Sequence, residues 1–144
     1  MSMSTDTELD LIRLIFVNTH IGQFSCQHRH PENFWNPAFQ LHPSGAERVA
    51  GVVAVAHDPA RHRDFLLAFT AAAGSRETGD GFTLELSRGE IEVTTPAAFE
   101  RRYELRAPDV SRGLRLAALR FSGATLAASQ HDVLGAALVF EPSR

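Results

Sequence analysis

Apolar and polar residues follow one another along the chain in patterns that predict several β-strands. Two short apolar stretches, LIRLIFVNT (residues 11–19) and GQFSCQH (residues 22–28), have the composition of strands. A third stretch, RVAGVVAVA (residues 48–56), shows hardly any alternation, which is typical of a strand buried on both faces. In GFTLELSRGEIEVTT, apolar and polar residues alternate on both sides of Arg88 and Gly89. This pattern predicts a β-hairpin with one apolar face packed on a helix and one acidic face in water.

Helix signals separate these strands. Asp58 and Pro59 have the types of an N-cap and a first helical residue, and Gly74 offers a stop, so we expect a helix over residues 59–72. Its apolar face would consist of Phe65, Leu66 and Phe69. A second, shorter helix is expected to begin at Pro96.

The rest of the chain completes a mixed, mainly antiparallel α+β pattern. Further strands are expected at residues 114–123 and 135–142, with a short helix at residues 124–130. The order over residues 48–94 is then β-α-β-β, and the strand near Leu114 begins a repeat of it.

Length and charge limit what this chain can be. With 144 residues, 44% of them hydrophobic, it suits one domain with a real core. The formal net charge is −3, from 14 basic and 17 acidic residues that are scattered along the chain, so we expect no nucleic-acid partner. All the basic residues are arginines, which excludes lysine Schiff-base chemistry and a P-loop lysine.

The single cysteine, Cys26, excludes an intrachain disulfide and a thiolate zinc cluster, which makes a cytoplasmic location the default. The N-terminus has an acidic lead-in, and Arg13 interrupts its short apolar run. It therefore lacks the marks of a signal peptide or a membrane span, and we expect no membrane partner.

The richest candidate chemistry lies in CQHRHPENFW, residues 26–35. His28 and His30 are two positions apart, so in an extended backbone they share a face, and a metal site with other histidines is one interpretation. Hydrogen-bonded loop histidines are the other. Cys26 beside His28 invites a thiolate–imidazole pair, although a small buried side chain explains the cysteine as well. We interpret Trp35 as a pocket wall, because its ring offers apolar area and an N–H donor together.

The loop over residues 29–45 is longer than a compact domain usually carries without a function. One hypothesis makes it the rim of a ligand pocket, with His28 as the polar contact, Trp35 as the wall and His42 as a second donor or acceptor. The other makes it a dimer clasp whose aromatic side chains pack on a partner chain.

The segment CQHRHPENFWNPAFQLHPSGA, with AGVVAVAHDPARHRDFL, LELSRGEIEVTTPAAFERRY and RLAALRF, resembles the glyoxalase-like proteins of the vicinal oxygen chelate (VOC) superfamily. The likeness is to a bacterial, largely uncharacterised branch with a CQH…FW…P…HP-N/S-GA segment, and it covers about residues 16–141. It implies βαβββ modules, which pair in this family into a cup-shaped, eight-stranded sheet around a substrate or a metal.

Two departures from the family pattern make the chain look like a half-length relative. Family members normally carry a complete module before this segment, and the tail is too short for a full second one. We therefore expect a single glyoxalase-like domain over residues 1–144, and a homodimer in which one chain completes the sheet of the other. Its expected parts are a disordered stretch (1–10), strands and a long loop (11–45), a βαββ core (46–95), and a short helix with a partial second module (96–144).

The resemblance also bears on metals. Metal-dependent relatives carry a His, Gln or Glu ligand at the first strand of each module and a Glu on a late strand. Here the matching strand positions fall near Gly51 and Ala117, which cannot bind a cation, and only Glu141 sits where a family carboxylate could sit. One carboxylate does not hold a divalent ion, so we expect no metal cofactor.

Two function classes stay open. One is a metal-independent, glyoxalase-like lyase that acts on a small oxygenated molecule, with His28 as general acid or base and Trp35, His42 and Glu141 in its binding site. The other is a non-catalytic ligand-binding or dimerisation module of the same fold. A metal-dependent lyase or dioxygenase with a histidine cluster is a further alternative.

Overall fold

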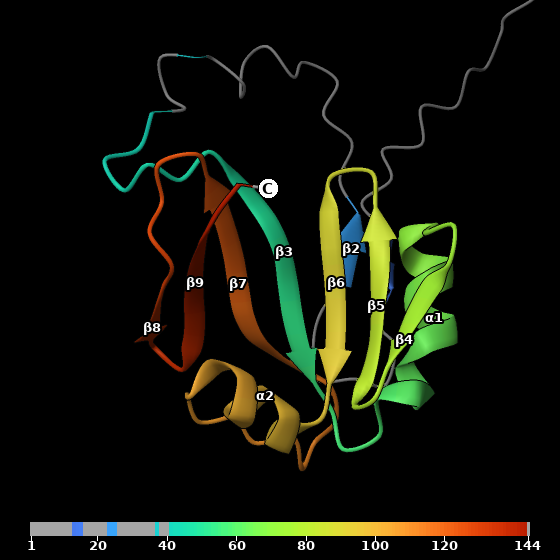
Figure 1. The fold of residues 1–144 in the computed structure, drawn as a ribbon. Helices are drawn as coiled ribbons and strands as arrows, with labels where there is room; N and C mark the ends of the chain where they lie inside the picture. The colour runs from blue at the N-terminus through green and yellow to red at the C-terminus, as the bar shows by residue number, and fades with distance from the viewer. Residues whose placement is uncertain (1–12, 16–22, 26–36, 38–40, 144) are drawn as a thin grey trace, which may run out of the picture.

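The structure, a computed structural model, describes residues 13–15, 23–25, 37 and 41–143. It is a mixed α+β fold in which an open seven-stranded sheet carries two α-helices (Figure 1). The strand order is β4-β5-β6-β3-β7-β9-β8. These strands are β3 (Arg48–Val55), β4 (Ser75–Thr78), β5 (Gly81–Leu86), β6 (Gly89–Thr94), β7 (Arg115–Gly123), β8 (Ser129–Val133) and β9 (Ala136–Pro142).

The sheet combines antiparallel hairpins with two parallel contacts. β3 lies in the centre, parallel to β6 and antiparallel to β7. β9 is likewise parallel to β7, and the remaining neighbours are antiparallel. A separate antiparallel pair, β1 (Arg13–Ile15) and β2 (Gln23–Ser25), lies within the first two predicted strands.

The expected helix over residues 59–72 is shorter and divided in the structure. Pro59–His62 form a 3-10 turn, η3, and α1 spans Arg63–Thr70 before Ala71 adopts the left-handed conformation at φ 52°. The Asp58 side chain makes no capping hydrogen bond. The first turn therefore closes in the tighter 3-10 geometry that is common at helix starts.

The second helix, α2, spans Pro96–Tyr103, as the Thr-Pro pair predicts. Thr95 caps it, because its hydroxyl oxygen accepts from the backbone N–H of Ala98 at 3.3 Å.

The sequence pattern was wrong about two elements. Strand β4 was not expected, because its residues SRET are polar on both faces, as an exposed edge strand allows. The short helix expected at residues 124–130 is a turn followed by the start of β8.

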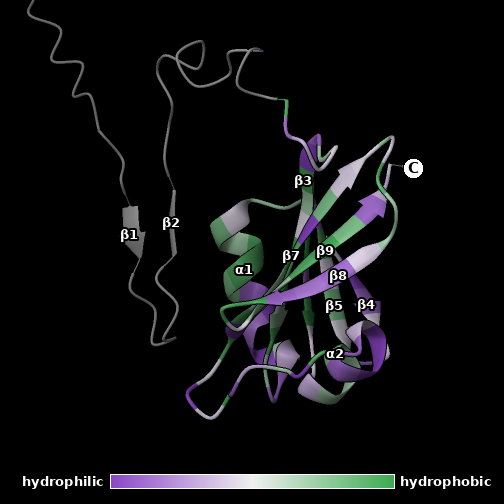
Figure 2. Cartoon of the chain, turned by 90° about the vertical axis from the view of Figure 1, so that its left-hand side faces the viewer, coloured by the Kyte–Doolittle hydropathy of each residue, from purple (hydrophilic) through white to green (hydrophobic). Residues whose placement is uncertain are grey.

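The two helices lie on opposite faces of the sheet (Figure 2). On one face, Leu66 of α1 packs with Phe82 and Leu84 of β5, which confirms the predicted packing of the hairpin on this helix. On the other face, Phe99 and Tyr103 of α2 pack on the central strands. The acidic side of the hairpin was expected to face water. It lies on the α2 face, where Glu85 is exposed as expected but Glu92 is buried.

Candidate polar cavity on the sheet

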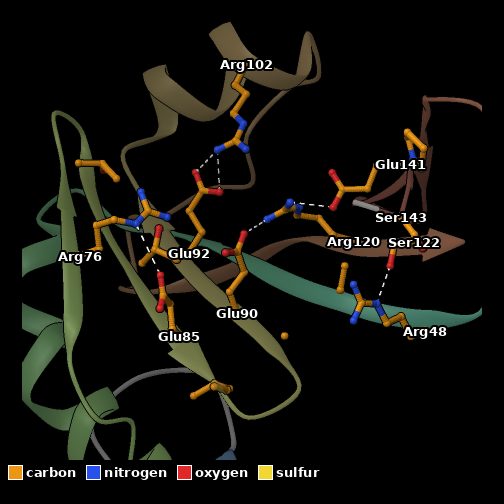
Figure 3. Close-up of a pocket in the computed structure, with 16 residues that line it drawn as sticks. Arg48, Arg76, Glu85, Glu90, Glu92, Arg102, Arg120, Ser122, Glu141 and Ser143 are labelled. Carbon is orange, nitrogen blue, oxygen red and sulfur yellow. Dashed lines mark hydrogen bonds and ion pairs between the residues drawn. The ribbon is translucent and has the colours of Figure 1, made fainter. Parts of the chain in front are cut away.

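A polar cavity of about 950 Å³ opens on the α2 face of the sheet, beside the helix (Figure 3). Six strands and α2 contribute side chains to it. The charged residues of its lining are four arginines and four glutamates: Arg48, Arg76, Arg102, Arg120, Glu85, Glu90, Glu92 and Glu141.

Arg120 lies in the middle of the cavity, between two carboxylates (Figure 3). Its Nη1 donates to Oε1 of Glu90, and its Nη2 donates to Oε1 of Glu141 at 2.7 Å. The side chain is only 9% exposed. Burial acts to lower the pKa of Arg120, but the hydrogen bond to Glu90 and the charges of Glu141 and Glu90 outweigh it, and the net shift is upward. Arg120 is therefore a fixed cation inside the cavity.

Glycine at position 51 lets Arg120 reach Glu90. In the sheet register, Gly51 of β3 stands opposite Glu90 on one side and Arg120 on the other. Paired residues of neighbouring strands share a face, so any side chain at position 51 would rise between the two charged groups. A Cβ there would lie 2.6 Å from the Glu90 carbonyl oxygen and 3.0 Å from its Cγ. Because Gly51 has no side chain, Arg120 of β7 and Glu90 of β6 can form an ion pair across β3.

A second ion pair connects α2 to the floor of the cavity. Nη1 of Arg102 donates to both carboxylate oxygens of Glu92, at 2.7 and 2.8 Å. The guanidinium of Arg102 also lies 5.2 Å from the centre of the Tyr103 ring. α2 is therefore fixed over the sheet by a charged contact as well as by its apolar face.

The Tyr103 side chain places a buried hydroxyl next to this cavity. Its hydroxyl is buried and has no hydrogen-bond partner among the described residues. Burial, followed by the charge of Glu92, raises the pKa of Tyr103 to about 12. The phenol is therefore neutral at physiological pH and keeps a proton to donate.

Arg48 is a further cation of the cavity lining, an exposed residue at the start of β3. Its Nε donates to the hydroxyl oxygen of Ser122, the residue opposite it on β7, at 2.9 Å. A register shift between Val49 and Gly51 follows, which leaves Ala50 as an extra residue in β3 beside β7. No contact of its two terminal nitrogens is found among the described residues, so they are open to a ligand.

The residues expected in a binding site lie in different places. Glu141 lines the cavity and is an ion-pair partner of Arg120. His42 lies in an exposed turn, where its Nδ1 is 2.8 Å from the Ser44 hydroxyl oxygen, away from the described lining of the cavity. His28 and Trp35 fall outside the described residues, so their roles stay predictions.

The lining does not suit a divalent cation. The two carboxylates that face one another here, Glu90 and Glu141, are bridged by the guanidinium of Arg120, which would repel a metal ion. The positions singled out from the resemblance are a glycine under that bridge, Gly51, and a buried alanine, Ala117. In the part of the chain that the structure describes, no three His, Cys, Asp or Glu side chains gather as metal ligands.

Sequence reasoning missed most of this cavity. It noticed that Glu85, Glu90 and Glu92 share one face, but it assigned that face to solvent, which is right for Glu85 and wrong for Glu92. The signal that could have corrected it is Arg120, a lone charged residue in the middle of the apolar strand sequence LAALRF. A buried arginine requires carboxylate partners, and the acidic face of the hairpin offers them.

Comparisons with known proteins add a fold likeness alone. No family model matches the chain, and no curated protein matches it either. A solved structure, the crystal structure of a hypothetical protein from Staphylococcus aureus, is similar with a TM-score of 0.50 at 11% sequence identity. The likeness covers 67% of this chain and 33% of that one, so the chain spans about a third of that protein. No helix in the described residues is long and apolar enough to cross a membrane.

Proposed function

We propose that this chain is a glyoxalase-like protein that binds a small oxygenated molecule in the polar cavity without a divalent metal. The observation that carries the proposal is the placement of Arg120 between Glu90 and Glu141 in a cavity of about 950 Å³. The permanent guanidinium holds both carboxylates in place at the cavity, where they can accept hydrogen bonds from a ligand. In metal-dependent relatives, a metal cation lies beside a late-strand carboxylate.

The strand connections support a βαβββ module. From β3 the chain runs through α1 to β4, β5 and β6, and β6 returns as the parallel neighbour of β3. β7, β8 and β9 repeat part of this pattern, since β9 is the parallel neighbour of β7 and β8 pairs antiparallel with β9. This arrangement supports the proposal of a partial second module over residues 96–144.

The charged groups of the cavity favour binding over catalysis. Glu90, Glu92 and Glu141 are each hydrogen-bonded to an arginine. Carboxylates held in this way orient a ligand more readily than they exchange protons with it. The role of His28 as a general acid or base is a separate hypothesis, and loss of turnover but not of binding in His28→Ala would support it.

The test is binding by chelator-treated protein. A set of small oxygenated compounds is screened by thermal shift in EDTA, and compounds that bind are measured by calorimetry against two variants. Ala50→Phe fills the cavity at a lining position, and Ala68→Phe adds the same ring to an exposed site on α1. We expect at least a tenfold loss of affinity in the first variant and none in the second. Binding that requires an added divalent ion, or that Ala50→Phe leaves unchanged, would overturn the proposal.

A further inference from the structure

The charge balance of the polar cavity points to a class of ligand. We infer that the cavity takes a small hydroxycarboxylate, whose carboxylate binds Arg48 and whose hydroxyl groups donate to Glu90 and Glu141. The inference rests on the proposed function and goes beyond it, because it names the groups that the ligand must carry.

Arg48 is the cavity arginine without a carboxylate partner among the described residues. Arg102 and Arg120 hold theirs at hydrogen-bond distance, and Arg76 lies 3.9 Å from Glu85. Within the described residues, Arg48 hydrogen-bonds to Ser122 through Nε, and its two Nη groups have no partner there. Paired Nη groups match the two oxygens of a carboxylate.

The carboxylates around Arg120 can accept hydrogen bonds from hydroxyl groups of a ligand. Glu90 and Glu141 each bond to Arg120 through Oε1, and the Oε2 atoms have no partner in the described chain. Both side chains are partly open to the cavity, at 29% and 32% exposure. Ionised carboxylates only accept hydrogen bonds, so a ligand satisfies them with O–H groups.

The same triad limits the charge of the ligand. One arginine between two glutamates carries a formal charge of −1, which repels a dianion more strongly than a monoanion. Arg48 offers a single positive charge to balance the negative charge of the ligand. A monocarboxylate therefore fits better than a phosphate monoester, which carries close to two negative charges at neutral pH.

The register limits the length of the ligand. Arg48, Ser122 and Glu141 stand opposite one another on the neighbouring strands β3, β7 and β9. Adjacent strands lie about 4.8 Å apart, so the backbones that carry Arg48 and Glu141 are separated by roughly 10 Å. This separation is an upper limit, because both side chains extend into the cavity, and a chain of about six carbons with the carboxylate at one end is the length to test.

The experiment compares matched probes on the full chain in EDTA by calorimetry. D-gluconate carries both kinds of group, D-sorbitol lacks the carboxylate, hexanoate lacks the hydroxyls, and D-sorbitol 6-phosphate carries a terminal phosphate in place of the carboxylate. We expect gluconate to bind at least tenfold more tightly than each of the others. Arg48→Gln should weaken gluconate binding at least tenfold, and Arg115→Gln, which changes an exposed arginine near the other end of β7, should leave it unchanged.

Two results with gluconate would overturn the inference. One is an equal affinity for gluconate and sorbitol, or no gluconate binding at millimolar concentration. The other is gluconate binding that Arg48→Gln does not weaken, with both variants folded by circular dichroism. A neutral molecule that binds and is lost in Ala50→Phe, but not in Arg48→Gln, would leave the proposed function standing and refute the hydroxycarboxylate.

Discussion

Arg120 decides the electrostatics of the cavity at the scale of single residues. The carboxylates of Glu90 and Glu141 lie on one face of the sheet and repel one another unless a positive charge lies between them. The guanidinium of Arg120 supplies this charge. Unlike a bound metal ion, it cannot dissociate from the protein, and it does not lose its proton. The cavity can therefore keep one charge distribution over the physiological pH range, which suits a binding site for a polar molecule.

Tyr103 gives a test of the buried charges around the cavity. Its pKa is raised to about 12 from the ordinary value of 10.0, so folding favours the protonated phenol. The stabilisation is complete below pH 10 and is lost as the pH rises through 12. Two units correspond to roughly 2–3 kcal/mol in the free energy of unfolding. We expect urea unfolding to show this loss between pH 10 and 12.

Tyr103→Phe is the matched variant, because it removes only the unpartnered hydroxyl. It should raise the free energy of unfolding at pH 8 by about 1 kcal/mol and flatten its dependence on pH above 10. The chain has one tyrosine and no lysine, so absorbance at 295 nm reports this phenol directly and few other groups titrate in that window. A folded protein whose tyrosine titrates at pH 10 would contradict the buried assignment.

The residues of the cavity were only partly predictable from sequence. Glu141 was placed in the site through a family resemblance, and Gly51 was noted as a position without a ligand. The sequence does not show that Gly51, Glu90 and Arg120 stand side by side, because that depends on the registers of three strands. Strand register is set by pairing between distant segments, which local pattern does not contain.

At the scale of elements, strong local patterns predicted well and weak ones failed. The hairpin of β5 and β6 follows from strict alternation, and α2 follows from its Thr-Pro start. β4 and β8 were missed, since both are exposed edge strands with little apolar alternation. Their conformation comes from the neighbouring strand and not from their own composition.

Gly51→Ala tests how the central strand controls the cavity. The added methyl group would meet the backbone carbonyl of Glu90, and relief requires β3 and β6 to separate. We expect the free energy of unfolding to fall by roughly 1–3 kcal/mol, and the ion pair between Glu90 and Arg120 to be weakened. The affinity for ligand should fall as well. A loss of affinity in the folded variant distinguishes a damaged cavity from a loss of stability alone.

Gly74→Ala is the control for that experiment. A Cβ at position 74 meets no atom within 4 Å, so the change should be neutral or stabilise the fold by about 0.5 kcal/mol. Equal stability of the two variants in urea unfolding would show that β3 and β6 do not approach as closely as the register indicates.

At the scale of the whole molecule, the sheet is covered unevenly. α1 packs over β5 and β6 on its face, but none of the described helices covers β7, β9 and β8 there. That area has an apolar groove of about 560 Å³ lined by Val133, Leu138 and Phe140, among others. Phe121 stacks on Phe140 beside it, with ring centres 5.3 Å apart.

We expect a second copy of the chain to cover this groove, because β8 is also an edge strand whose unpaired backbone can join the same strand of a two-fold partner. Val133→Glu places a charge in the groove, whereas Ala97→Glu places one on the exposed surface of α2 as a control. Sedimentation velocity at micromolar concentration should show a dimer for the natural chain and the control, and a monomer for Val133→Glu. A natural chain that sediments as a monomer would refute the homodimer. A dimer that tolerates Val133→Glu would show that the chains meet elsewhere and that the groove has another occupant.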